Sequence, residues 1–240
     1  MYKKRRRHLA VTFALFKVAI LATLLIFISC GMVLTVYGIL AKGYDLKQLG
    51  KMPLPSTVYD CHGNEIGKIN GSKLKFIALK EVSSDFQKAL IIREDVRFYE
   101  HKGIDPAGIL RAFYRNVFKK KREGASTITM QLARNSFSEL MSQKTLHRKL
   151  IEAQLARRIE KEYSKDQILE FYINRIFFGS GIYGIENASL SYFGKKAIDM
   201  NLSEAAMLAG IIRGPNRFSP FRNFKAANEQ RKTVLGRMHQ

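Results

Sequence analysis

Cysteine is scarce in this chain of 240 residues: only two are present. Cys30 lies inside an apolar run and Cys61 lies outside it, so we do not expect a disulfide between them. No cluster of Cys and His has the spacing of a zinc site. Internal repeats and low-complexity stretches are also lacking. The part of the chain beyond the apolar run, about 200 residues, is large enough to bury a full core without cross-links.

Charged side chains are absent from residues 18–40, a run that as a helix would be roughly 34 Å long, enough to cross a bilayer. Basic residues 3–7 precede it, so the positive-inside rule predicts a cytoplasmic tail (1–17) and an exterior domain. A cleaved signal peptide is the alternative, but its apolar region is usually about 7–15 residues long. We therefore predict a single-pass membrane protein with the span at 18–40, an N-terminus in the cytoplasm and a linker over 41–55.

Acidic residues are few: 20 Asp and Glu face 41 Lys and Arg, which gives a formal net charge of +21. Such an excess attracts polyanions or an anionic membrane surface. A domain that faces outward from the membrane meets little nucleic acid, so nucleic acid is not an expected partner. Phospholipid headgroups and lipid-linked phosphates are the expected partners instead. The alternative for many individual Lys and Arg residues is a side chain that is exposed to solvent and binds no partner.

The apolar spacing beyond the linker is mostly helical. Residues 57–69 predict a small β-hairpin. After it, Ser84 with Gln87 and Ser164 with Gln167 have the spacing of capping boxes that open helices. We therefore predict a mainly α fold.

Residues 109–118 predict an amphipathic helix, in which apolar side chains alternate with basic ones such as Arg111. A helix of this kind often lies in a membrane interface. The same apolar stripe could equally pack on the core, and the sequence leaves both possibilities open.

Glu94 is predicted to lie where an apolar helix ends, with Asp95 beside it and His101 close behind. A partly shielded carboxylate in such a place can act as a general base. The alternative is an ordinary exposed glutamate that pairs with Arg93 or Arg97.

Glu152 is a second carboxylate surrounded by basic residues, with Arg148 four positions and Lys149 three positions before it. A surface ion pair on one helical face explains this spacing as well. Two such carboxylates in one basic, outward-facing domain favour a functional role for both.

Residues 124–131 combine glycine with hydroxyl and amide side chains, which suit a sugar or phosphate ligand or, equally, a helix cap. Basic residues that could neutralise a pyrophosphate flank this stretch, namely Arg134, Lys144, Arg148 and Lys149. Residues 179–184 match the dinucleotide pattern GxGxxG, but no strand–turn–helix unit surrounds them. We predict a turn between helices there.

These stretches, in their order and spacing, resemble the family 51 glycosyltransferases, the domain that polymerises peptidoglycan in bifunctional penicillin-binding proteins and in monofunctional transglycosylases. The motifs that carry the resemblance are residues 93–103, 124–131, 148–152, 165–174 and 209–220. The similarity places a glycosyltransferase domain at 56–222 and leaves 223–240 as a C-terminal helical tail. Because no transpeptidase domain follows, we expect a monofunctional enzyme, and a truncated bifunctional one is the alternative.

The resemblance implies a lysozyme-like helical lobe and a smaller, membrane-associated jaw. It also implies that the 4-hydroxyl of lipid II attacks a growing glycan carried on undecaprenyl pyrophosphate, forming a β-1,4 bond with inversion. Glu94 matches the catalytic base. Glu152 matches the carboxylate that assists the leaving pyrophosphate or holds a divalent cation (Mg²⁺ or Mn²⁺), with no cofactor obligatory.

The resemblance further implies a set of substrate contacts: Ser126, Thr127, Gln131, Arg134, Lys144, Arg148, Lys149, Arg111 and Asn174. This chain departs from the family at Met130, where a glutamine is usual. Penicillin-binding transpeptidases and proteins of the division or elongation machinery are expected partners. The rival functions are a membrane-anchored muramidase and a non-catalytic scaffold that binds anionic lipid.

Overall fold

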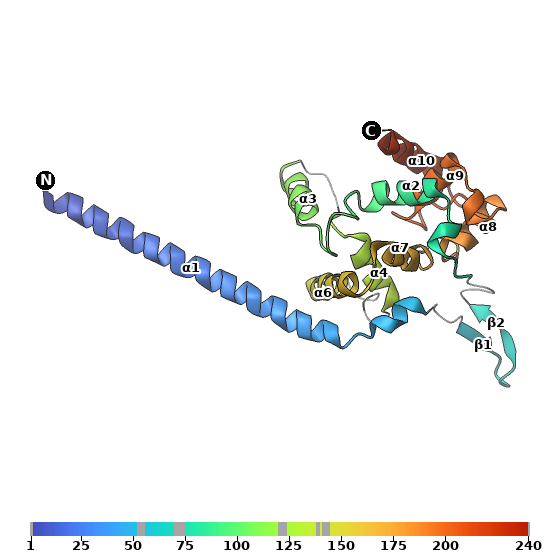
Figure 1. Ribbon diagram of the computed structural model, residues 1–240, viewed down its shortest axis with the longest axis horizontal. Coiled ribbons are helices and arrows are strands. Elements are labelled where there is room, and N and C mark those ends of the chain that lie inside the picture. Colours follow the sequence, from blue (N-terminus) through green and yellow to red (C-terminus); the bar gives the residue numbers. More distant parts are fainter. Residues whose placement is uncertain are drawn as a thin grey trace. The chain divides into compact units, whose positions relative to one another are not determined.

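The computed structural model describes residues 2–51, 56–69, 75–119, 124–137, 140 and 145–239 (Figure 1). The chain divides into two compact units, Met1–Gly43 and Tyr44–Gln240. The first unit is the helix α1 (Tyr2–Lys42). Its segment Leu15–Lys42 is long and apolar enough to cross a membrane, and it includes the predicted span 18–40.

The second unit contains a hairpin, in agreement with the sequence. Strands β1 (Ser56–Tyr59) and β2 (Glu65–Ile69) pair antiparallel, with a bulge next to Tyr59. Asp60 closes the turn, because its carboxylate accepts the backbone N–H groups of His62 and Asn64, both at 2.8 Å.

The rest of the second unit is helical, which confirms the predicted mainly α class for the described residues. Its α-helices are α2 (Ser84–Glu94), α3 (Pro106–Phe118), α4 (Ile128–Ser136), α6 (Leu146–Glu162), α7 (Lys165–Ile173), α8 (Ile185–Phe193), α9 (Leu202–Ile211) and α10 (Phe224–Met238). Short 3₁₀ helices are η1 (Leu46–Gly50), η2 (Leu79–Glu81) and η3 (Ala197–Asp199).

One of the two predicted capping boxes is present. Ser164 accepts the N–H of Gln167, and the Gln167 side chain accepts the N–H of Ser164. The prediction of a capping box at Ser84 was wrong, because the N-cap of α2 is Ser83, whose hydroxyl makes no cap hydrogen bond and donates instead to the carbonyl of Met200. Gln87 instead donates to two carbonyl groups before α2.

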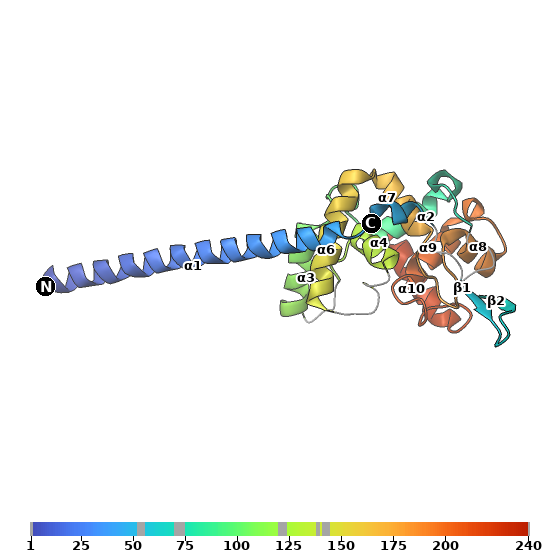
Figure 2. The same ribbon diagram turned by 90° about the horizontal axis from the view of Figure 1, so that it is seen from below.

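The helices of the second unit pack in two groups, α2 with α9 and α10, and α4 with α6 and α7 (Figures 1 and 2). The contact of α9 with α10 is close: a Cβ atom at Gly210 would lie 3.0 Å from the backbone of Gln230. The largest fully buried side chains include Tyr172, Phe86 and Phe98.

Residues 179–184 form the predicted turn between α7 and α8. Gly179 has a φ of +90°, and a Cβ atom there would lie 2.4 Å from the carbonyl oxygen of Pro215. Glycine is therefore required at this position for both its conformation and its size.

Three side chains donate hydrogen bonds to backbone carbonyl groups at the start of the second unit. They belong to Arg158 of α6, Tyr163 just after α6, and Arg175 just after α7. The buried Arg175 guanidinium donates to the carbonyl groups of Gln48 (2.7 Å) and Lys51. Arg158 donates to the carbonyl of Tyr44 and Tyr163 to that of Leu46, each at 3.2 Å. Burial lowers the pKa of Arg175 to about 10.

Candidate active site

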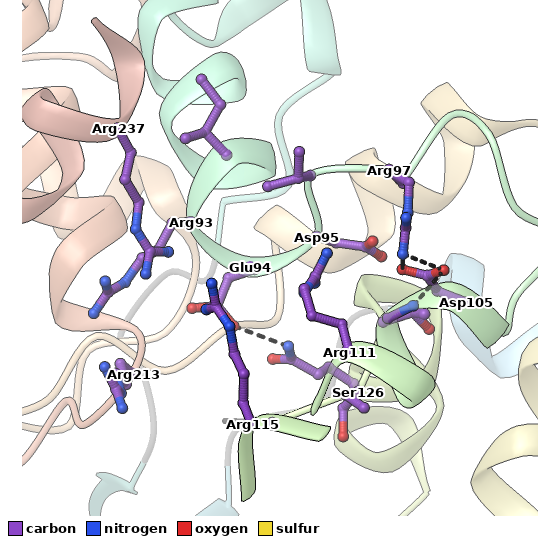
Figure 3. A pocket seen from close by; sticks show the side chains of 17 residues that line it. Arg93, Glu94, Asp95, Arg97, Asp105, Arg111, Arg115, Ser126, Arg213 and Arg237 are labelled. Carbon is purple, nitrogen blue, oxygen red and sulfur yellow. Dashed lines mark hydrogen bonds and ion pairs between the residues drawn. The ribbon is translucent and has the colours of Figure 1, made fainter. Parts of the chain in front are cut away.

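Glu94 is the half-buried last residue of α2 and lines a cavity of about 490 Å³ (Figure 3). The carboxylates of Asp95 and Asp105 also line it. Six arginines come to the same cavity from α2, α3, α10 and the segments between helices: Arg93, Arg97, Arg111, Arg115, Arg213 and Arg237. Since cations outnumber carboxylates two to one in this lining, the cavity is suited to a polyanion.

Glu94 receives a hydrogen bond from the first turn of α4. The Gln131 Nε2 donates to Glu94 Oε2 at 2.9 Å, and the Gln131 Oε1 accepts from the Tyr172 hydroxyl at 2.9 Å. Burial, aided by the negative charge of Glu94, raises the pKa of Tyr172 well above its usual value. Tyr172 therefore stays protonated and acts as a donor.

Asp95 and His101 connect the end of α2 to the start of α4. The buried Asp95 carboxylate accepts the Ile128 N–H at 2.9 Å and meets His101 Nε2 at 3.0 Å. The Gly103 N–H donates to His101 Nδ1 at 3.2 Å, so Nε2 carries the proton and donates to Asp95. Both side chains are thus committed to structure.

The hydroxyl of Thr127 is committed as well. It accepts the Met130 N–H as the N-cap of α4 and donates to the carbonyl of Gly103 at 2.7 Å. The helix cap, one of the two alternatives that the sequence left open at this residue, is present, and Thr127 also lines the cavity. Met130 is buried in the core, so the departure from the family pattern does not remove a side chain from the cavity.

The arginines of the cavity differ in their surroundings. Arg97 forms a bidentate pair with Asp105, with Nη2 at 2.7 and 2.8 Å from the two carboxylate oxygens. Burial raises the pKa of Asp105, but hydrogen bonds from Arg97 and the Gly108 N–H outweigh burial and leave this pKa below its usual value. Arg93 is buried and donates to Gln230 at 2.6 Å.

Like charges gather around Arg93. Burial lowers the pKa of Arg93; Glu94 opposes this effect, while the nearby Arg237 and Arg213 lower the pKa further. Guanidinium groups that destabilise one another in this way are stabilised when an anion binds between them.

Glu152 is fully buried in α6 and is not among the described residues that line the cavity. Its two oxygens pair with Arg148 Nε at 3.0 Å and Lys149 Nζ at 2.9 Å. Lys149 also donates to Ser126 Oγ at 2.7 Å, and Ser126 lines the cavity. Glu152 is therefore connected to the cavity wall through Lys149.

Two of the remaining predicted site residues, Asn174 and Arg134, are not among the described residues that line the cavity. Asn174 is buried and bonds the backbone of Ile77 and Glu170, a structural position. Arg134 is half-buried in the last turn of α4. Lys144 lies outside the described residues.

A divalent cation does not fit the residues around Glu152, because both carboxylate oxygens already face cations. Within the described ranges, no group of three or more His, Cys, Asp or Glu residues could hold a metal ion.

Sequence reasoning did not identify Arg115, Arg213, Arg237 and Tyr172. Arg115 lies in the predicted basic amphipathic helix and Arg213 in the last of the motifs, so the sequence weakly indicated that each belongs to the site. Arg237 lies in the predicted tail, and nothing in its sequence surroundings distinguishes it from a solvated residue.

Residues 62–239 match the model of the protein family described as Transglycosylase. The chain is 41% identical over 185 residues to penicillin-binding protein 1F of Bacillus subtilis (strain 168), covering 77% of this chain and 26% of that protein. It is 40% identical over 209 residues to penicillin-binding protein 1A of Haemophilus influenzae, covering 85% of this chain and 24% of that protein. The chain thus spans about a quarter of the length of these relatives. A crystal structure of penicillin-binding protein 1A from Haemophilus influenzae matches 78% of this chain and 18% of its own, with 20% identity and a TM-score of 0.40.

Proposed function

We propose, from the premise that this chain belongs to the Transglycosylase family, that it polymerises lipid II into the glycan strands of peptidoglycan and releases undecaprenyl pyrophosphate. The observation that carries the proposal is the position of Glu94: a carboxylate at the end of α2, in the wall of a cavity that six arginines share. A base beside concentrated positive charge suits the activation of a hydroxyl while a diphosphate leaves.

In this reaction Glu94 removes the proton from the 4-hydroxyl of lipid II as the oxygen attacks the anomeric carbon of the growing glycan. The bond from that carbon to the pyrophosphate breaks, and the electron pair leaves with the phosphate oxygen. Attack from the opposite side converts the α-linkage into a β-1,4 bond. The proton remains on Glu94 until the product departs.

The arginines would stabilise the negative charge that develops on the leaving pyrophosphate. Arg111 and Arg115 reach the cavity from α3, and Arg213 and Arg237 reach it from the opposite side (Figure 3). Preorganised charge of this kind is usually the largest single contribution to the rate. Because α10 packs on α2 and α9 and supplies Arg237, we include α10 in the glycosyltransferase domain.

Glu152 would act on the substrate indirectly, through Lys149. By pairing with Arg148 and Lys149 it holds the Lys149 ammonium against Ser126, at the edge of the cavity. This arrangement supports a role in placing positive charge for the pyrophosphate.

We place the enzyme in the bacterial inner membrane, with the N-terminus in the cytoplasm and the second unit outside. Helix α3 supports contact of this unit with lipid, because only Gly108 and Ala112 of its residues are buried. Its exposed apolar side chains are Ile109, Leu110, Phe113, Tyr114, Val117 and Phe118. Such exposure favours the membrane interface over core packing and suits the expected jaw.

The test is to incubate the purified full chain separately with lipid II and with finished glycan strands, and to follow the products on a gel. We expect polymer from lipid II, and a rate lower by about 10²–10⁴-fold in Glu94→Gln with unchanged membrane association. Glu162→Gln, which changes an exposed carboxylate at the end of α6, should polymerise normally. Breakdown of strands without polymer would indicate a muramidase, and full activity of Glu94→Gln would remove Glu94 from its role.

A further inference from the structure

A line of hydrogen bonds runs from the core to the cavity, from Tyr172 through Gln131 to Glu94. We infer that Tyr172 and Gln131 are positioning residues, which hold one oxygen of the Glu94 carboxylate and leave the other for the substrate hydroxyl. This inference rests on the proposed function, in which Glu94 is the base. It assigns to Gln131 a role other than the substrate contact that the sequence suggests.

The direction of each hydrogen bond follows from the chemistry of the groups. A carboxylate can only accept, so the amide nitrogen of Gln131 must face Glu94 and its oxygen must face Tyr172. The Tyr172 side chain is fully buried and its hydroxyl donates to that oxygen at 2.9 Å. Since the two ends of an amide have nearly the same shape, the hydroxyl of Tyr172 helps to fix which end meets Glu94.

The backbone that carries Gln131 is also held firmly. Asp95 accepts the Ile128 N–H, and Thr127 accepts the Met130 N–H, so side chains fix the first turn of α4. The Gln131 N–H donates to the carbonyl of Thr127 at 3.0 Å. Gln131 therefore meets Glu94 from a rigid element, as positioning of a base requires.

Only one of the two Glu94 oxygens is engaged by this arrangement. Among the hydrogen bonds of the described ranges, Oε2 accepts from Gln131 and Oε1 has no partner. Oε1 belongs to a side chain that lines the cavity, so it is the oxygen available to a bound hydroxyl (Figure 3).

The other charged groups that line the cavity, among the described residues, are Arg93 and Asp95 beside Glu94, Arg97 and Asp105 before α3, Arg111 and Arg115 of α3, Arg213 after α9, and Arg237 of α10. Loss of the Gln131 hydrogen bond would leave these groups in place, so its effect on kcat can be measured separately.

Tyr172→Phe tests the inference, because phenylalanine fills the same space and removes only the hydroxyl. We expect kcat for lipid II polymerisation to fall about five- to tenfold, the factor that one hydrogen bond of ordinary strength supplies, with KM changed less than about twofold.

Gln131→Met removes the donor to Glu94 and keeps an unbranched side chain of similar length. We expect a larger loss than in Tyr172→Phe. If Tyr172 acts through Gln131, adding Tyr172→Phe to Gln131→Met should lower kcat no further, whereas independent effects would multiply.

Tyr192→Phe is the matched control, because it removes a half-buried hydroxyl that donates to the carbonyl of Phe178 at 2.9 Å. It should keep the wild-type kcat and KM. Carboxyl-carbon NMR of the full chain in detergent, with Glu94→Gln to assign the resonance, gives a readout without turnover: the chemical shift of the Glu94 carboxyl carbon should change in Tyr172→Phe and stay the same in Tyr192→Phe.

The outcomes separate this inference from the proposed function. A wild-type protein that forms no polymer from lipid II refutes the proposed function, and the inference with it. A wild-type protein that polymerises, together with a Tyr172→Phe variant of normal kcat and unchanged Glu94 chemical shift, refutes the inference alone. Multiplicative losses in the double variant would likewise overturn it.

Discussion

Replacement of Glu152 by glutamine should destabilise the second unit and slow the enzyme. The Glu152 side chain is fully buried and pairs with two cations, Arg148 at 3.0 Å and Lys149 at 2.9 Å. An amide in its place keeps the size of the side chain and removes the charge. Both cations would then remain near the protein interior without their carboxylate.

The magnitude follows from the exposure of the partners. Removing one member of a fully buried ion pair typically costs about 3–5 kcal/mol. Here the Arg148 side chain is 12% exposed and that of Lys149 is 38% exposed, so water relieves part of the cost. We expect a loss of about 2–3 kcal/mol, which for a domain of this size lowers Tm by about 4–12 °C.

Thermal unfolding of the full chain in detergent, followed by circular dichroism, measures the loss. The matched variant is Arg148→Gln combined with Glu152→Gln, which removes the charge at both ends of one pair. It should melt above Glu152→Gln alone, because no guanidinium is then left uncompensated. Polymerisation assayed well below both melting temperatures should be at least about tenfold slower in Glu152→Gln, since Lys149 loses the group that holds it against Ser126.

Two results would contradict this reasoning. A Tm of Glu152→Gln equal to that of the wild type would mean that the carboxylate does not stabilise the two cations. A normal rate of polymerisation in the folded variant would mean that the second carboxylate has no part in the reaction.

Two further changes test the packing and the burial around the site. A Cβ atom at Gly103 would lie 2.6 Å from the carbonyl oxygen of Ala156 at a φ of +90°, so Gly103→Ala should lower the free energy of unfolding by about 2–4 kcal/mol in urea. Gly63→Ala, at a φ of +84° with no atom nearby, should cost only about 1 kcal/mol, and equal losses would disprove the clash. Tyr172 keeps its proton in the folded state above pH 10, where the unfolded chain loses it, so stability should fall by about 1.4 kcal/mol per pH unit above that pH. Tyr172→Phe should lack this part of the alkaline slope, and identical slopes in the two proteins would show that the hydroxyl is not buried.

The elements that depend on local pattern were predictable from the sequence. The apolar helix, the hairpin and the helical class follow from composition and period, and α2 ends at Glu94 as its apolar spacing indicates. The turn at 179–184 follows from its glycines. Each of these features is determined by residues close together in the chain.

The partners of polar side chains were not predictable in the same way. Asn174 has the residue type of a ligand contact, but its amide bonds the backbone of Ile77, a residue 97 positions away. Thr127 similarly serves as a helix cap and bonds Gly103. Only the packing of the chain decides whether such a group faces a cavity or a carbonyl.

The convergence of the arginines also depends on packing. Arg237 comes to the cavity because α10 lies on α2 and α9, and no spacing within residues 223–240 indicates this contact. Tyr172 was predictable as an apolar position of α7, since its ring fits the stripe of buried residues. The partner of its hydroxyl depends on the distance between α7 and α4, which the sequence does not state.

The hydrogen bonds from Arg175 to the backbone carbonyl groups of Gln48 and Lys51 have an evolutionary consequence. Main-chain oxygens are the same for every amino acid, and the side chains of both residues point into solvent. Homologous proteins can therefore vary at positions 48 and 51 without loosening the attachment, whereas loss of the buried guanidinium would break both hydrogen bonds at once, because one nitrogen, Nη2, donates to both carbonyl groups.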